Sequence, residues 1–169
     1  MAKPLANGYP IGAILMKDKI ATAMTAGLYL IVKCEVTAYI SFGTGSHGTT
    51  FGGSPLGCAV GHHVLGRLSE PSFADQMKGT SVYLRKRLEL LPKWFPGTLQ
   101  EQVRGRGLIQ GLGFKDSKHP GRIVELARER GLFVLTAGKD AVRLVPSLNI
   151  GKEEVDLALD VIESSIGQL

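Results

Sequence analysis

Residues Gly43–Gly53 read GTGSHGTTFGG, and this glycine-rich stretch decides which fold the chain is expected to have. Its first six letters fit G-x-G-x-x-G, the pattern of a dinucleotide-binding loop between a strand and a helix. The context does not fit, because five residues separate Gly48 from Ser54, the expected N-cap of the next helix. The acidic residue at a plausible distance, Glu70, falls at a helix end. A P-loop fails as well, since no Gly-Lys-Ser/Thr follows.

The second half of the stretch has chemical content of its own. HGTTFGGSP combines two hydroxyl side chains, a run of backbone amides and the start of a helix. These groups together are suited to binding an anion. An ordinary connector is the alternative, because glycine is also used wherever the backbone needs a positive φ.

Composition narrows the classes of function. The chain has 169 residues and a net charge of +5, which permits anionic ligands. Its basic residues are scattered, so nucleic-acid binding is not expected, and no apolar run reaches membrane-spanning length. Cys34 and Cys58 do not make a disulfide framework, which favours a reducing compartment. The histidines and cysteines lack metal-ligand spacing, and no G-x-S-x-G serine-hydrolase motif is present.

Apolar patterning predicts strands alternating with helices, an α/β or α+β architecture. Helices are expected over 17–27, 54–68 (with Leu56, Val60, Val64 and Leu68 as a buried stripe), 72–91, 120–131 and 151–167. The last of these should bury Val155, Leu159, Ile162 and Ile166. Strands are expected over 10–16, 28–42, 103–114, 132–138 and 141–150, and a connector over 92–97.

A second segment accompanies the glycine loop. AKPLANGYPIGA (Ala2–Ala13) places Lys3 ahead of a Gly/Pro turn and an apolar stretch. With HGTTFGGSP, and with VRGRGL, TAG and RLVPSLNI following in order, it resembles the class III pyridoxal-phosphate-dependent aminotransferases. Asn7 stands at a common glycine position of that family and Ser54 at a common asparagine position, and neither change removes a reactive group. The resemblance covers nearly the whole chain except 28–45.

The resemblance implies roles for four residues. Lys3 would be catalytic and cofactor-binding: its amine would form the Schiff base with the aldehyde of pyridoxal 5'-phosphate and afterwards carry a proton. Thr50, with Thr49 beside it, would bind the cofactor phosphate across a dimer interface. Arg143 would bind the substrate α-carboxylate with its two-pronged guanidinium. A surface lysine, a turn-stabilising threonine and an ion-paired strand arginine are the structural alternatives.

The implied fold is α/β, the C-terminal part of a fold type I transferase. Residues 1–69 would be the end of the large cofactor-binding domain and 70–169 a small α+β domain. Residues 28–45 have no family counterpart, and we expect either a retained intron or a genuine insertion forming a hairpin. Since the family's cofactor site also uses residues upstream of the lysine, we expect little activity from the 169-residue chain alone.

The implied reaction is amino transfer from an acetylated ornithine to 2-oxoglutarate in arginine biosynthesis, as in similar fungal members. The partners would be amino-acid and 2-oxo-acid substrates and a second copy in a homodimer. Ornithine or another ω-amino acid is the alternative donor, and a non-catalytic dimerisation partner is the alternative class. The family resemblance implies the mitochondrial matrix, with the cytoplasm as the alternative.

Overall fold

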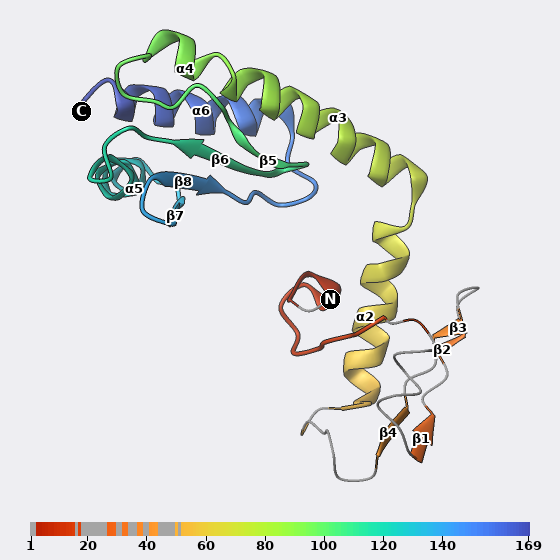
Figure 1. The fold of residues 1–169 in the computed structure, drawn as a ribbon. Helices are drawn as coiled ribbons and strands as arrows, with labels where there is room; N and C mark the ends of the chain where they lie inside the picture. Colours follow the sequence, from red (N-terminus) through yellow and green to blue (C-terminus); the bar gives the residue numbers. More distant parts are fainter. Residues whose placement is uncertain are drawn as a thin grey trace. The chain divides into compact units, whose positions relative to one another are not determined.

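The structure is a computed structural model that describes residues 3–15, 17, 27–29, 32–33, 37–38, 41–43, 50 and 52–169 (Figure 1). The chain divides into two compact units, Met1–Ser69 and Glu70–Leu169.

The N-terminal unit begins with a 3-10 helix, η1 (Lys3–Ala6). The strand expected over 10–16 is wrong for residues 11–15, which have no regular secondary structure. Ile14 and Leu15 are 57% and 58% exposed. No described strand pairs with this segment, and an extended segment without a hydrogen-bonding neighbour does not form a sheet. The helix expected over 17–27 lies mostly outside the described residues, and Gly27 belongs to a strand.

Four short strands occupy the described part of 27–43. They are β1 (Gly27–Tyr29), β2 (Val32–Lys33), β3 (Thr37–Ala38) and β4 (Ser41–Gly43). β1 pairs antiparallel with β4, and β2 with β3. The nested order of the two pairs is that of a hairpin. The β-rich composition predicts extended backbone here, and the described residues are extended, but they form short pairs rather than the one long strand expected.

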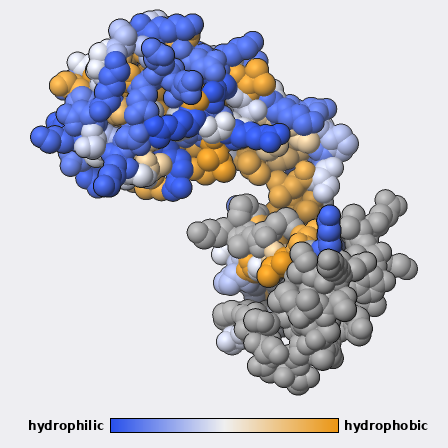
Figure 2. All heavy atoms as spheres, viewed as in Figure 1, coloured by the Kyte–Doolittle hydropathy of each residue, from blue (hydrophilic) through white to orange (hydrophobic). Residues whose placement is uncertain are grey.

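The helix α2 (Pro55–Leu68) begins where the sequence predicts, with Ser54 as N-cap and Pro55 at the first helical position. The expected buried stripe is wrong. Leu56 is 59% exposed, and the residues that α2 buries are Gly57 and Gly61. Figure 2 accordingly shows hydrophobic surface along the visible part of α2. The helix packs through its glycines, whereas Val60, Val64 and Leu68 of the stripe are only half-buried.

The C-terminal unit is a layer of helices on a four-stranded antiparallel sheet. Its elements are α3 (Pro71–Leu88), α4 (Leu91–Trp94), β5 (Arg104–Arg106), β6 (Ile109–Gly113), α5 (His119–Glu129), β7 (Leu135–Ala137), β8 (Ala141–Leu144) and α6 (Lys152–Ile166). The strand order is β5-β6-β8-β7 (Figure 1). Alternate sheet residues such as Leu112 and Val142 share one core with α3, α5 and α6.

The helices of this unit confirm most of the patterning. Val155, Leu159, Ile162 and Ile166 of α6 are all buried, as their spacing predicts. The connector expected over 92–97 contains part of the short helix α4.

The single strand expected over 103–114 is wrong, because β5 and β6 form a hairpin with Arg106 opposite Ile109. The two-residue turn has Gly107 at φ 60°, and no such angle occurs at Leu108. This combination fits a type II′ turn, one of the favoured hairpin turns. Leu108 is buried in the core, so the turn also anchors the hairpin.

Candidate functional site

The segment that carries Lys3 packs against α2. The helix η1 contacts α2, and two glycines of α2 make room for the residues after η1. A Cβ added at Gly57 would lie 3.0 Å from Tyr9 Cε1, and one added at Gly61 would lie 3.0 Å from Ile11 Cδ1. The lysine segment is therefore held on the N-terminal half of α2 by close packing that larger residues would obstruct.

Polar contacts continue this packing to the beginning of α2. The Tyr9 hydroxyl lies 3.5 Å from Ser54 Oγ. Ser54 Oγ also accepts a hydrogen bond from the Gly57 amide at 3.5 Å, as an N-cap does. Leu5 and Ala6 at the end of η1 are buried. The structure thus brings the lysine segment to the helix that follows the expected phosphate loop.

Thr50 is the loop residue that the structure describes among the expected cofactor contacts. It lies in a turn and is exposed, as are Gly52 and Gly53. Thr49 and the side chain of Lys3 lie outside the described residues. The first turn of α2 contains no acidic residue, so the positive end of the helix dipole is not neutralised there. Exposed amides, a hydroxyl and an uncompensated helix N-terminus fit a phosphate group.

Arg143 lies on β8 in the other unit, between Gly111 of β6 and Leu135 of β7. It is exposed on the sheet face opposite Val142, which is fully buried. Gly111 also pairs with Arg104 of β5, so the two arginines stand on one face with a residue between them that lacks a side chain.

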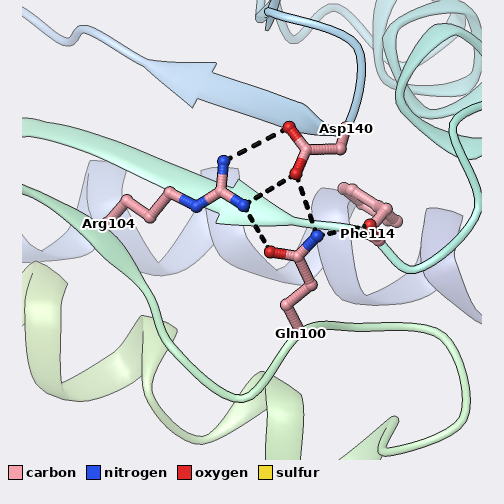
Figure 3. Close-up of polar contacts among 4 residues, drawn as sticks. All are labelled: Gln100, Arg104, Phe114 and Asp140. Atoms are coloured by element: carbon pink, nitrogen blue, oxygen red, sulfur yellow. Dashed lines mark hydrogen bonds and ion pairs between the residues drawn. The ribbon is translucent and has the colours of Figure 1, made fainter.

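Arg104 is held in a network with Asp140 and Gln100 (Figure 3). Arg104 Nη1 and Nη2 donate to the two carboxylate oxygens of Asp140 at 3.2 and 2.7 Å, and Nη2 also donates to Gln100 Oε1. Gln100 Nε2 donates to Asp140 Oδ2 at 2.9 Å and to the carbonyl of Phe114 at 2.8 Å. The hydrogen bonds from Arg104 and Gln100 lower the pKa of Asp140 to about 2.

The two arginines on this face therefore differ in availability. Arg104 already has its carboxylate. Arg143 makes no ion pair or side-chain hydrogen bond with any residue that the structure describes. An exposed guanidinium without a partner can take up a carboxylate from a ligand in a bidentate geometry.

Two other kinds of site find no support within the described ranges. They contain no group of three or more His, Cys, Asp or Glu placed to hold a metal ion. None of the described helices is long and apolar enough to cross a membrane. His62 and His63 on α2 are both exposed.

The sequence profile of the family described as Aminotransferase class-III matches residues 1–166. The chain belongs to the class III aminotransferases.

Individual class III relatives extend the comparison. A mitochondrial acetylornithine aminotransferase of Yarrowia lipolytica is 39% identical over 98% of this chain, which spans 35% of that protein. The solved N-acetylornithine aminotransferase of Stenotrophomonas maltophilia is 34% identical with a TM-score of 0.61, over 68% of this chain and 31% of that one. The ornithine delta-aminotransferase of Plasmodium falciparum is 28% identical with a TM-score of 0.65, over 73% and 32%.

Sequence reasoning missed two groups in this aminotransferase chain. Tyr9 connects the lysine segment to Ser54, a contact 45 residues apart in sequence that no local pattern reveals. Asp140 and Gln100 had little local signal, because their partnership with Arg104 depends on the order of the strands. An aspartate just before the strand that carries Arg143 was the one available hint.

Proposed function

We propose that this chain is the part of an aminotransferase that holds pyridoxal phosphate through Lys3 and the substrate carboxylate through Arg143. The proposed reaction is amino transfer between N-acetylornithine and 2-oxoglutarate in arginine biosynthesis, in mitochondria. The proposed assembly is a homodimer. Family membership and the names of the relatives support the reaction. The observation that carries the proposal is the docking of the lysine segment on the helix that follows the loop containing Thr50.

The residues of the N-terminal unit suit the cofactor. Class III aminotransferases use pyridoxal phosphate, which when bound supplies an electron sink for charge at the carbon that carries the amino group. Thr50 would hold the phosphate with its hydroxyl, together with the amides ahead of α2. The Lys3 amine would bond to the cofactor and, once displaced by substrate, would take up and return a proton. Burial of Leu5 and Ala6 in η1 would restrict where that amine can move.

Arg143 would provide orientation. A guanidinium that grips both carboxylate oxygens fixes the substrate in rotation as well as position, so that one C–H bond faces the base. Because Arg104 is paired with Asp140, Arg104 would not compete with Arg143 for the substrate carboxylate, and Asp140 would not compete with that carboxylate for Arg143. Residues 1–69 would then contribute the end of the large domain and 70–169 the small domain, as two units that must both be present.

A second donor is retained, because the Plasmodium neighbour is named an ornithine delta-aminotransferase. Both donors carry an α-carboxylate and a distal nitrogen, so Arg143 would serve either one. The two differ in whether the α-nitrogen is an uncharged amide or a cationic amine. Among the described residues, Arg143 makes no ion pair with an acidic side chain, and Asp140 is paired with Arg104.

The test is a cofactor titration followed by substrate addition. The 169-residue chain is mixed with pyridoxal phosphate, and the visible absorbance band of lysine-bound cofactor is recorded. Lys3→Ala should abolish the band, whereas Lys17→Ala, at an exposed lysine of the same unit, should leave it unchanged. N-acetylornithine should then change the band more than ornithine does. A band that survives Lys3→Ala would contradict the assignment of the cofactor lysine, and a preference for ornithine would favour the second donor.

A further inference from the structure

A hollow of about 470 Å³ opens between α3 and the β5–β6 hairpin in the C-terminal unit. Arg85 and Lys86 of α3 line one side, and Arg106 of the hairpin lines the other, next to Gly105 and Gly107. Its volume lies within the range of small-molecule sites. All the lining residues belong to one compact unit, so the hollow does not depend on how the two units are placed.

The charges around this hollow are of one sign. Its lining contains three cations and no acidic side chain. Arg85 has one counter-ion, because its Nε donates to Glu89 Oε1 at 2.6 Å. Lys86 and Arg106 form no ion pair with any residue in the described part of the chain. Two cations facing one hollow without compensation would repel each other, and an anion between them would relieve that repulsion.

The walls hold one of these cations, Arg85, in a fixed position. Arg85 Nη1 donates to Gln110 Oε1 at 3.1 Å, and Gln110 is buried and also bonds to the carbonyl of Gly107. Gly105 has φ 118° and no space for a Cβ, so the hairpin backbone here must remain bare. The hollow therefore joins bare backbone to guanidinium groups, whose fork of N–H donors matches the oxygens of a phosphate.

We propose that this hollow is a binding site for a small phosphate-bearing anion, separate from the cofactor and substrate residues. Arg106 and Lys86 supply the charge that binds the anion, and Arg85 is held in place by Gln110 and contributes its remaining N–H groups. Ordinary carboxylates bind more weakly here, because a single carboxylate has one negative charge for two uncompensated cations. A phosphorylated metabolite bound at this site stabilises the C-terminal unit.

Calorimetric titration of the whole 169-residue chain with inorganic pyrophosphate, in low-salt buffer free of phosphate, tests this site. Pyrophosphate lacks the aldehyde that would react with Lys3. Arg106→Gln and Lys86→Gln should each weaken binding by roughly tenfold. Arg128→Gln and Lys93→Gln are matched controls, because both residues are exposed, lie outside the hollow and have no ion pair among the described residues. The controls should weaken binding by less than about twofold.

Three outcomes would overturn the proposal. The first is an absence of saturable binding by the unchanged chain. The second is an equal loss in the control variants, which would show unspecific attraction by the net charge of +5. The third is loss of binding in Thr50→Val with none in Arg106→Gln, which would assign the anion to the cofactor loop. Thermal unfolding of each variant without ligand should match the unchanged chain, because both replaced side chains are exposed.

Discussion

Replacing Gly105 by alanine should destabilise the C-terminal unit more than any other single-methyl addition at its glycines. Gly105 has φ 118°, a backbone conformation that costs an L-residue about 1–3 kcal/mol. The new Cβ would also lie 2.2 Å from the carbonyl oxygen of Ile109 and 2.9 Å from Gln110 Cα. Real contacts essentially never fall below 3.0 Å, so the backbone of the hairpin would have to move. Losing one or two ladder hydrogen bonds adds about 1 kcal/mol each.

The expected loss is therefore about 2–5 kcal/mol, or more than about 10 °C in the midpoint of a domain of this size. Two glycines provide controls. Gly107 has φ 60° and no atom within 4 Å of an added Cβ, so Gly107→Ala should cost only the backbone term, about 1–2 kcal/mol. Gly79 lies exposed within α3 with open space around it, so Gly79→Ala should stabilise by up to about 1 kcal/mol.

Urea unfolding followed by the fluorescence of Trp94 measures this series. Trp94 is the one tryptophan of the chain and lies on α4 in the C-terminal unit, so its signal reports on that unit. The predicted order of stability is Gly79→Ala, unchanged chain, Gly107→Ala, Gly105→Ala. Equal losses at Gly105 and Gly107 would refute the steric argument, because both have positive φ but only a Cβ at Gly105 would clash with the hairpin backbone.

Two further predictions concern the site itself. Asp140 has a pKa lowered to about 2 in the folded chain, so its pairing with Arg104 stabilises the fold above its ordinary pKa of 3.8 and is lost as the pH falls toward 2. The thermal midpoint of unfolding should therefore fall more in the unchanged chain than in Asp140→Asn when the pH is lowered from about 5 to about 2. Gly57→Leu should push the Tyr9 ring off α2 and lower the yield of lysine-bound cofactor, whereas Gly66→Leu on the same helix, where no atom lies within 4 Å, should not. Equal yields in the two leucine variants would show that cofactor binding does not depend on this packing.

Local signals in the sequence predicted much of the C-terminal unit. The i, i+4 spacing of Val155 and Leu159 predicts the buried face of α6, because a helix that closes on one core repeats this spacing. The hairpin turn at Gly107 was missed, because glycine in an apolar run has no unique interpretation. Only pairing between Arg106 and Ile109 distinguishes a bend from a continuous strand.

The N-terminal unit was less predictable, since its residues are shaped by tertiary neighbours. The apolar stripe that begins at Leu56 predicts burial, yet α2 buries Gly57 and Gly61 instead. Glycines can be buried against a neighbouring segment, but they add nothing to a pattern of large apolar residues. The periodicity of those large residues therefore predicts the wrong buried face of α2. The roles of Lys3, Thr50 and Arg143 came from a resemblance of ordered motifs, and they stay predictions.

Reductive trapping of the cofactor tests the central claim most directly. The chain is incubated with pyridoxal phosphate, treated with borohydride to make the lysine bond permanent, digested, and read by peptide mass spectrometry. The account predicts that the adduct is concentrated on Lys3 and that prior addition of N-acetylornithine prevents its formation. An adduct spread evenly over the exposed lysines, with Lys3 no more modified than Lys17 or Lys93, would contradict it.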